Sequence, residues 1–129
     1  MPKKPLKTQK TLKEELKKEC FKLWKEKGFE KWGNKCEVCG GVATHPHHYI
    51  YRSQNGLLNY NLKNFIPLCP YCHIRIHRRP ASEVKRIYDR IRDVRGSKWC
   101  EEIDELEKTH KSSFKTIGWL KEQLEILKS

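Results

Sequence analysis

The sequence predicts a small α+β protein in which two short strands and a short helix are flanked by longer helices. Residues 11–34 and 81–129 carry apolar side chains at helical spacing. Residues 35–68 between them are instead broken by glycine, proline and asparagine, as in hairpins and loops. Two closely spaced pairs of cysteines bracket this middle segment. A chain of 129 residues is expected to form one domain with appended helices and a modest core.

The N-terminal part is predicted to be a basic flexible tail at residues 1–10, followed by an N-terminal helix within residues 11–34. Thr11 is the expected N-cap, because Glu14 follows it at the spacing of a capping box. An apolar stripe runs to Gly28, and we expect it to pack on the central domain, which has little core of its own. The stripe consists of Leu12, Leu16, Cys20, Phe21 and Trp24.

The central domain, residues 35–80, is predicted to have the order β-loop-β-α. Residues 42–51 are the first expected strand, and residues 65–68 are the second. A short helix is expected over residues 72–79, where a following proline ends it.

Three helices are expected in the C-terminal helical region, residues 81–129. The first has Ser82 as its N-cap and continues to Val94, the second covers residues 97–110, and the third begins near Thr116. These helices carry no residues suited to chemistry. Their apolar faces fit a docking platform, a homodimer surface or simple packing.

The charge of the chain is strongly basic and unevenly distributed, with a formal net charge of +12. Residues 1–35 hold 12 lysines against 5 glutamates, and residues 36–80 hold 5 basic side chains against 1 acidic. Residues 81–129 are nearly balanced, with 11 basic against 10 acidic. This distribution favours a polyanionic partner, and a merely solvated basic surface is the other interpretation.

The chain is predicted to be an intracellular, cytoplasmic protein. It has no apolar run near the ~20 residues that cross a bilayer, and no segment that resembles a cleavable leader. In a reducing compartment its six cysteines are not expected to form disulfides. Cys20 and Cys100 lie outside the closely spaced pairs, beside aromatic residues in helical patterns, and are expected to be buried small hydrophobes.

The other four cysteines predict a structural zinc site. Cys36 and Cys39 resemble one zinc knuckle, and Cys69 and Cys72 resemble a second. Four thiolates satisfy tetrahedral Zn²⁺ and leave no open coordination position. Such an ion contributes folding free energy, on the order of 10 kcal/mol in small zinc peptides, but it cannot act as a catalyst.

Histidines between and after the knuckles predict a second metal site. Adjacent side chains of an extended segment point to opposite faces, so one of His47 and His48 can bind an ion while the other faces a water. His73 and His77 are four residues apart and share one face of the expected helix, a spacing suited to one ion. The other interpretation is that these histidines are surface residues of a basic loop, or alternative zinc ligands.

This segment resembles the HNH (His-Asn-His) endonucleases in their four-cysteine form. The resemblance is carried by His47-His48-Tyr49 and by the run from Asn64 to His77, NFIPLCPYCHIRIH. It implies a small ββα-metal (HNH) core with two zinc knuckles, an N-terminal helix and about three C-terminal helices. The activity that it implies is hydrolysis of DNA phosphodiester bonds with one divalent ion.

The same resemblance implies a role for each residue of the motif. His48 is the general base that activates water, and Asn64 hydrogen-bonds across the loop to orient it. His47 and His73 hold the catalytic divalent cation. The sequence leaves open whether His77 joins them as a ligand, contacts a phosphate or is a residue of the helix surface. The cation can be Mg²⁺, Mn²⁺, Ni²⁺ or Zn²⁺, and the expected products carry 5′-phosphate and 3′-hydroxyl ends.

The wider arrangement is similar to the NinG (Rap) recombination nucleases of phages. The similarity rests on a basic helical lead-in, the Arg52-Ser53 pair and a helical tail. His47 and His73 stand where that group has glycine and asparagine, which brings this chain closer to HNH enzymes in general. The similarity implies branched recombination intermediates as substrates.

Basic side chains near the motif are the expected DNA contacts, and low sequence specificity is expected because nothing resembles a base-reading module. Tyr49 and Tyr51 either stack on a base or pack in the hairpin. A non-catalytic, zinc-stabilised DNA-binding protein is the alternative to a nuclease. The expected DNA contacts are Arg52, Lys63, Arg75, Arg78 and Arg79.

Overall fold

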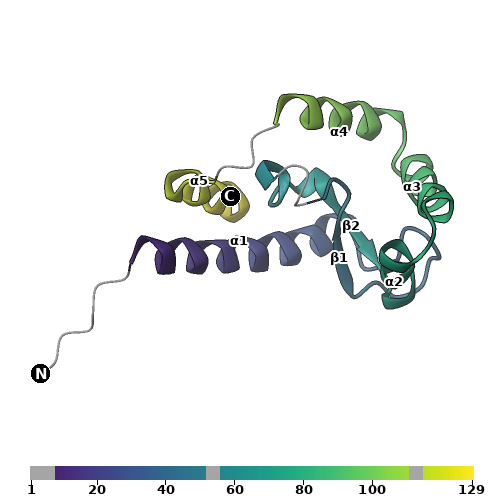
Figure 1. The fold of residues 1–129 in the computed structure, drawn as a ribbon, viewed down its shortest axis with the longest axis horizontal. Helices are drawn as coiled ribbons and strands as arrows, with labels where there is room; N and C mark the ends of the chain where they lie inside the picture. Colours follow the sequence, from purple (N-terminus) through teal and green to yellow (C-terminus); the bar gives the residue numbers. More distant parts are fainter. Residues whose placement is uncertain (1–7, 52–55, 111–114) are drawn as a thin grey trace, which may run out of the picture.

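The computed structural model describes residues 8–51, 56–110 and 115–129. A long helix leads into a two-stranded hairpin, and shorter helices curve around the hairpin before the last one returns to the first (Figure 1). The elements are α1 (Gln9–Trp32), β1 (His45–His48), η1 (Gly56–Leu58), η2 (Leu62–Asn64), β2 (Phe65–Leu68), α2 (Pro70–Arg78), α3 (Ala81–Arg95), α4 (Ser97–Thr109) and α5 (Ile117–Lys128). The α+β class and the β-loop-β-α order are therefore confirmed.

The hairpin pairs β1 with β2 in antiparallel register, with His45 opposite Leu68 and His48 opposite Phe65. The second strand occupies the predicted residues, but the first is shorter than the predicted 42–51. It ends at His48 because the backbone N–H and carbonyl of Ile50 bond to the side chain of Asn64 instead of to a strand. The chain thereby leaves the sheet directly after the two adjacent histidines.

Helix α1 begins earlier than the capping pattern predicted. The Thr8 side chain accepts a hydrogen bond from the backbone N–H of Thr11 at 3.1 Å, so Thr8 is the N-cap and Thr11 lies inside the helix. The prediction of Thr11 was wrong because both threonines offer a hydroxyl, and the helix takes the earlier one. Gly33, at φ 85°, ends the helix in a backbone conformation that favours glycine.

Gly28 does not end α1; it is a buried contact point. A Cβ atom at this position would lie 2.1 Å from a ring carbon of Phe65 in β2. The missing side chain lets the helix lie directly against the hairpin, and Trp24 one turn earlier packs edge-on against the same Phe65 ring. The end of the apolar stripe, at Trp24 and Gly28, thus packs on the central domain, as expected.

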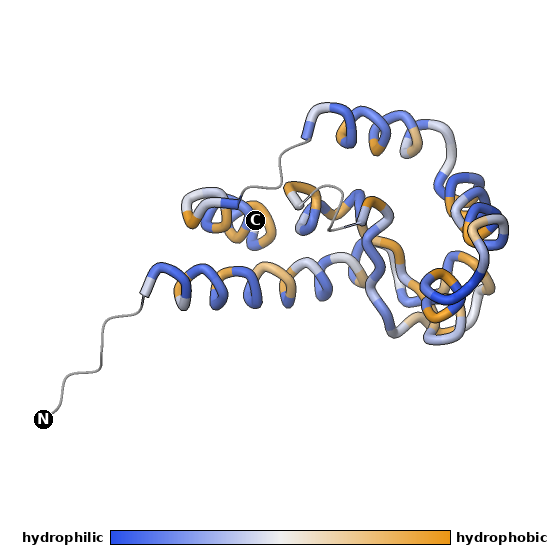
Figure 2. The backbone as a smooth tube through the Cα atoms, viewed as in Figure 1, coloured by the Kyte–Doolittle hydropathy of each residue, from blue (hydrophilic) through white to orange (hydrophobic). Residues whose placement is uncertain are grey.

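Helix α5 covers the other part of that stripe. Leu120, Leu124 and Leu127 are buried in one cluster with Leu16, Cys20 and Trp24 of α1. Figure 2 shows α5 lying alongside α1, with apolar stretches on both helices. The Cys20 thiol is fully buried and donates a hydrogen bond to the carbonyl of Leu120 at 3.4 Å, which fits its predicted role as a small buried hydrophobe.

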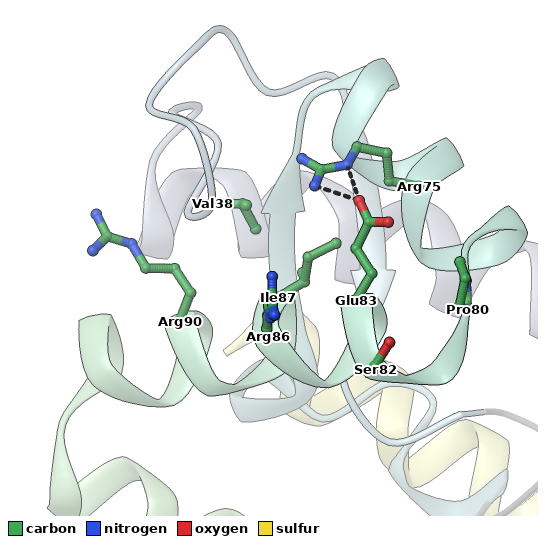
Figure 3. A pocket seen from close by; sticks show the side chains of 8 residues that line it. All are labelled: Val38, Arg75, Pro80, Ser82, Glu83, Arg86, Ile87 and Arg90. Atoms are coloured by element: carbon green, nitrogen blue, oxygen red, sulfur yellow. Dashed lines mark hydrogen bonds and ion pairs between the residues drawn. The ribbon is translucent and has the colours of Figure 1, made fainter.

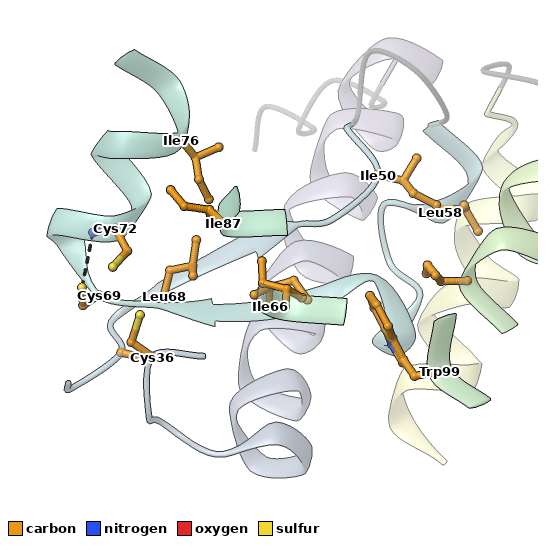
Figure 4. Close-up of a cluster of buried hydrophobic side chains, with 13 residues drawn as sticks. Cys36, Ile50, Leu58, Ile66, Leu68, Cys69, Cys72, Ile76, Ile87 and Trp99 are labelled. Atoms are coloured by element: carbon orange, nitrogen blue, oxygen red, sulfur yellow. Dashed lines mark hydrogen bonds between the residues drawn. The ribbon is translucent and has the colours of Figure 1, made fainter. Parts of the chain in front are cut away.

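Helices α3 and α4 pack on the hairpin from the opposite direction. Ile87 of α3 and Trp99 of α4 join Ile66, Leu68 and Ile76 in a second buried cluster (Figure 4). The half-buried Cys100 packs against this cluster, and its thiol lies 3.6 Å from the carbonyl of Arg92.

The start of α3 corrects another predicted cap. The N-cap position is Pro80 without a side-chain hydrogen bond, and Ser82 lies within the first turn. Pro80 follows the end of α2 and directly precedes the first residue of α3. Ser82 is therefore already inside α3 and cannot be its N-cap. Among the described residues, no helix combines the length and apolar character needed to cross a membrane.

Candidate active site and metal centres

Four cysteine side chains converge beside the hairpin. Cys36, Cys39, Cys69 and Cys72 offer sulfur atoms that all lie within 4.8 Å of one another. The sulfurs of Cys39 and Cys69 are 3.6 Å apart, close to the roughly 3.8 Å edge of a tetrahedron with 2.3 Å Zn–S bonds. All six cysteines of the chain are free of disulfides. The set therefore fits a structural zinc.

Local backbone geometry holds each pair of thiols in place. Gly40, at φ 79°, closes the first knuckle, and its N–H donates to the carbonyl of Cys36 at 2.9 Å. In the second knuckle Cys69 is the N-cap of α2, and its sulfur accepts from the N–H of Cys72 at 3.3 Å. Burial raises the pKa of Cys36, but hydrogen bonds from nearby backbone N–H groups outweigh it and lower that pKa to about 7. The thiolate form of Cys36 is thus accessible near neutral pH. Burial and the neighbouring thiols instead raise the pKa of Cys72, so zinc has to displace the proton of that thiol.

A second cluster is formed by three histidines from two elements. His47 lies on β1, and His73 and His77 lie one turn apart on α2. One ring nitrogen from each lies within 4.8 Å of the others, and the Nε2 atoms of His73 and His77 are 3.2 Å apart. That separation is close to the roughly 3.3 Å expected for two nitrogens bound to one tetrahedral ion at 2.0–2.1 Å.

The electrostatics of this cluster favour the neutral form of His47 and His73. Burial of His47, together with the neighbouring His73, His77 and His48, lowers the pKa of His47 to about 3. Burial and the adjacent His77 also lower the pKa of His73. Neutral imidazoles carry the lone pair that a metal needs, so the donor set fits a divalent cation at neutral pH.

His48 points away from the histidine cluster toward α1. Its ring stacks on Trp24, with centroids 4.1 Å apart and planes inclined by 6°. Its Nε2 lies 2.8 Å from the carbonyl oxygen of Asn59. A carbonyl can only accept, so Nε2 carries the hydrogen and the lone pair of the neutral ring is on Nδ1. The alternation of His47 and His48 along the strand therefore places the two rings in different surroundings.

Both histidines nevertheless line the same cleft, which has a volume of about 620 Å³. The cleft also receives all three members of the histidine cluster. It is lined by Pro46, His47, His48, Tyr51, His73, Ile76 and His77.

Asn64 is fully buried and acts on the loop between the strands. Its Oδ1 accepts from the N–H of Ile50 at 2.6 Å, and its Nδ2 donates to the carbonyls of Ile50 and Leu58, each at 3.1 Å. Leu58 directly precedes Asn59, whose carbonyl holds His48. Asn64 is thus connected to His48 through the loop backbone, not through a direct contact.

The model of the HNH endonuclease family matches residues 36–79. This range contains both knuckles, the three clustered histidines, His48 and Asn64. Residues 36–79 form an HNH endonuclease domain. The family consists of phosphodiester hydrolases that use a divalent metal. No curated protein and no solved structure matches the chain significantly.

The basic residues expected to contact DNA differ in their exposure and in whether they form ion pairs. Arg78 and Arg79 are exposed where α2 ends, one and two residues after His77. Lys63 forms an ion pair with Glu102 at 2.6 Å. Arg52 lies outside the described residues.

Arg75 points away from the histidines of the HNH domain. Residues two apart in a helix project from nearly opposite sides, so Arg75 lies on the face of α2 away from His73 and His77. It binds Glu83 of α3 through Nε and Nη2, at 3.1 and 2.6 Å (Figure 3). A pocket beside this pair is also lined by Arg86 and Arg90.

Three side chains lie beside the histidines of the HNH domain without having been predicted there from the sequence. His45 shares a strand face with His47, and its ring lies 5.0 Å from that of His73; the two-residue period of the strand would have identified it. Trp24 and Tyr88 reach the site from α1 and α3, outside the matched residues. No local signal in the sequence connects them to the motif.

Proposed function

We propose that this chain is a metal-dependent DNA endonuclease whose HNH domain hydrolyses phosphodiester bonds with His48 as the general base. The observation that supports this most is the shared cleft. His48 and the three clustered histidines open into one space, so a general base and a metal-binding set face the same substrate.

In this proposal the Nδ1 atom of His48 accepts a proton from the attacking water. The water oxygen forms a bond to phosphorus while the bond from phosphorus to the 3′ oxygen breaks. The leaving 3′ oxygen takes up a proton from solvent water, so the products carry a 5′-phosphate and a 3′-hydroxyl. The Asn59 carbonyl accepts the hydrogen of Nε2 throughout, so it favours both the required tautomer and the imidazolium that forms.

His47, His73 and His77 are the residues that would hold the catalytic cation. When bound, a divalent ion supplies Lewis acidity that stabilises negative charge on the phosphate oxygens. The neutral state of His47 at pH 7 keeps its lone pair available for this purpose. His77, whose role the sequence left open, is included because its Nε2 lies beside that of His73.

Asn64 is proposed to be a positioning residue. It bonds to the loop that carries the Asn59 carbonyl, and it is too deeply buried to touch a substrate.

Among the basic residues, Arg78 and Arg79 have the placement best suited to phosphate contacts. They extend from the end of α2 beside His77 and are exposed. Arg75 and Lys63 would have to exchange a carboxylate partner for a phosphate. Contacts to the backbone carry no sequence information, so low sequence specificity is part of the proposal.

Replacement of His48 tests the general base. We expect His48→Ala and the bulkier His48→Gln to reduce plasmid nicking with Mg²⁺ or Mn²⁺ by about 10²–10⁴-fold, the usual contribution of general-base catalysis. His110, at the end of α4 and away from the cleft, provides the matched control His110→Ala. Zinc content and DNA binding in the absence of the catalytic ion should be retained in all three variants.

Undiminished cutting by both His48 variants would refute the assignment. Retained DNA binding with no nicking by the unaltered protein under any divalent metal would instead support a non-catalytic, zinc-stabilised DNA-binding protein.

Branched DNA and a homodimer are finer parts of the proposal. Cutting both arms of a junction requires two active sites, and hence two chains. The apolar faces of α4 and α5 pack mainly within the chain, which supports their role in packing. Comparing cleavage of four-way junctions, duplex and single strands, together with the mass in solution, distinguishes these possibilities.

A further inference from the structure

A tyrosine from outside the HNH domain contacts the histidine cluster. Tyr88 lies on α3, and its hydroxyl oxygen is 2.7 Å from Nε2 of His47. Its ring is packed edge-on between Tyr49 and Tyr51, at centroid distances of 5.0 and 6.3 Å. The residue is therefore held firmly while its hydroxyl points at a candidate metal ligand.

The hydroxyl is the part of Tyr88 that packing alone does not explain. A phenylalanine would make the same ring contacts with Tyr49 and Tyr51 without the hydroxyl group. His47 is only 4% exposed, so whichever of its nitrogens is not bound to metal needs a hydrogen-bond partner inside the protein. The hydroxyl of Tyr88 is the hydrogen-bond partner of Nε2.

The phenol is suited to accept a hydrogen at this point. A phenol is neutral at pH 7. A neutral hydroxyl has lone pairs for the Nε2 hydrogen. If Nε2 of His47 carries the hydrogen, its Nδ1 carries the lone pair.

We propose that Tyr88 is a positioning residue of the metal site: its hydroxyl accepts the Nε2 hydrogen of His47 and so presents Nδ1 of His47 to the ion shared with His73 and His77. The inference rests on the proposed function, because it assumes that this cluster holds the catalytic cation. It also makes α3, which lies beyond the matched residues, a component of the active site. Partners of this kind fix the ring and tautomer of metal-binding histidines.

The test compares Tyr88→Phe with the matched control Tyr49→Phe. Both variants remove one hydroxyl next to α3, but the hydroxyl of Tyr49 accepts from Arg92 and does not touch the histidine cluster. Calorimetric titration of the zinc-loaded protein with Ni²⁺ measures affinity for the histidine site without requiring cleavage. We expect a loss of about 10–100-fold in Tyr88→Phe and less than about twofold in Tyr49→Phe, as is typical for loss of a partner that orients a ligand.

A long-range ¹⁵N–¹H spectrum of the histidine rings gives a second readout. In the unaltered protein His47 should carry its hydrogen on Nε2; hydrogen on Nδ1 would overturn the proposal. Equal losses of Ni²⁺ affinity in the two tyrosine variants, or no loss in either, would overturn it as well. A protein that binds Ni²⁺ as expected but never nicks DNA would refute the proposed function and leave the role of Tyr88 intact.

Discussion

His47 illustrates how a single buried residue can be prepared for metal binding. The strand directs its ring away from α1 and toward α2, where burial and two further imidazoles keep it neutral. A proton on His47 would compete with the cation for the same lone pair. The low pKa therefore removes that competition over the physiological range.

The same low pKa predicts that the free energy of unfolding depends on pH. Replacing the histidine in His47→Gln should weaken this pH dependence. The unfolded chain protonates His47 near pH 6.5, whereas the folded protein does so only near pH 3. Below pH 6.5 the unfolded state thus binds more protons than the folded state. The free energy of unfolding therefore decreases as the pH is lowered from 6.5 to about 3. We expect the unaltered protein to lose about 1.6 kcal/mol more than the variant between pH 6.5 and 5.

Urea unfolding of the zinc-loaded proteins at a series of pH values measures this difference. Protonation of the cysteine thiolates weakens zinc binding in both proteins, so it cancels in the comparison. Parallel pH profiles for the two proteins would contradict the assigned pKa of His47.

At the scale of elements, α1 supports the hairpin strand that carries His48. It supplies the Trp24 ring on which His48 stacks, and Gly28 allows it to approach Phe65 of β2. Because β2 is paired with the strand that carries His48, the position of α1 also sets the position of the proposed base.

Gly28→Ala should separate α1 from the hairpin. The added methyl group would meet the buried Phe65 ring at 2.1 Å, and overpacking of this kind costs about 1–3 kcal/mol. We expect a lower free energy of unfolding together with reduced cleavage, since the stack of Trp24 on His48 would shift. Thermal melting and the nicking assay measure the two effects.

Gly118→Ala is the matched control in α5. Its nearest neighbour is 3.9 Å from the added Cβ, so the higher helix propensity of alanine should leave stability unchanged or raise it by up to about 1 kcal/mol. Equal behaviour of the two alanine variants would show that α1 has room to move.

At the scale of the whole molecule, Arg95 joins the zinc knuckle to the helices. Its Nε donates to Glu37 between the first two cysteines at 2.7 Å, and its Nη2 donates to the carbonyl of Phe65 at 2.6 Å. The guanidinium lies 3.5 Å from the ring centroid of Trp32 in α1 and 5.1 Å from that of Trp99 in α4. One buried side chain thus contacts the knuckle, β2, α1 and α4.

Arg95→Met should destabilise the entire fold by about 3–5 kcal/mol, because it leaves the carboxylate of Glu37 buried without its partner. Adding Glu37→Gln removes that charge and should restore part of the loss. Urea unfolding of both variants with zinc bound measures the effect. A cost below about 1 kcal/mol for the single variant would show that Arg95 is not a structural link.

Much of the HNH domain could be predicted because its signals are local. The short spacings of the cysteines define the knuckles, and the period of the strand separates His47 from His48. The predicted second strand occupies the observed residues for the same reason. The prediction that Thr11 and Ser82 are N-caps was wrong. Serine and threonine are common, and tertiary packing decides at which of them a helix begins.

The sequence by itself determined which residues can bind metal and on which face of each element they lie, because these properties follow from residue type and from periods of two or four residues. Only the tertiary structure decided that His48 stacks on Trp24, that Asn64 acts through a loop, and that Tyr88 touches His47. These contacts join positions from 6 to 41 residues apart. No local period encodes them, and they form only when the helices close around the hairpin.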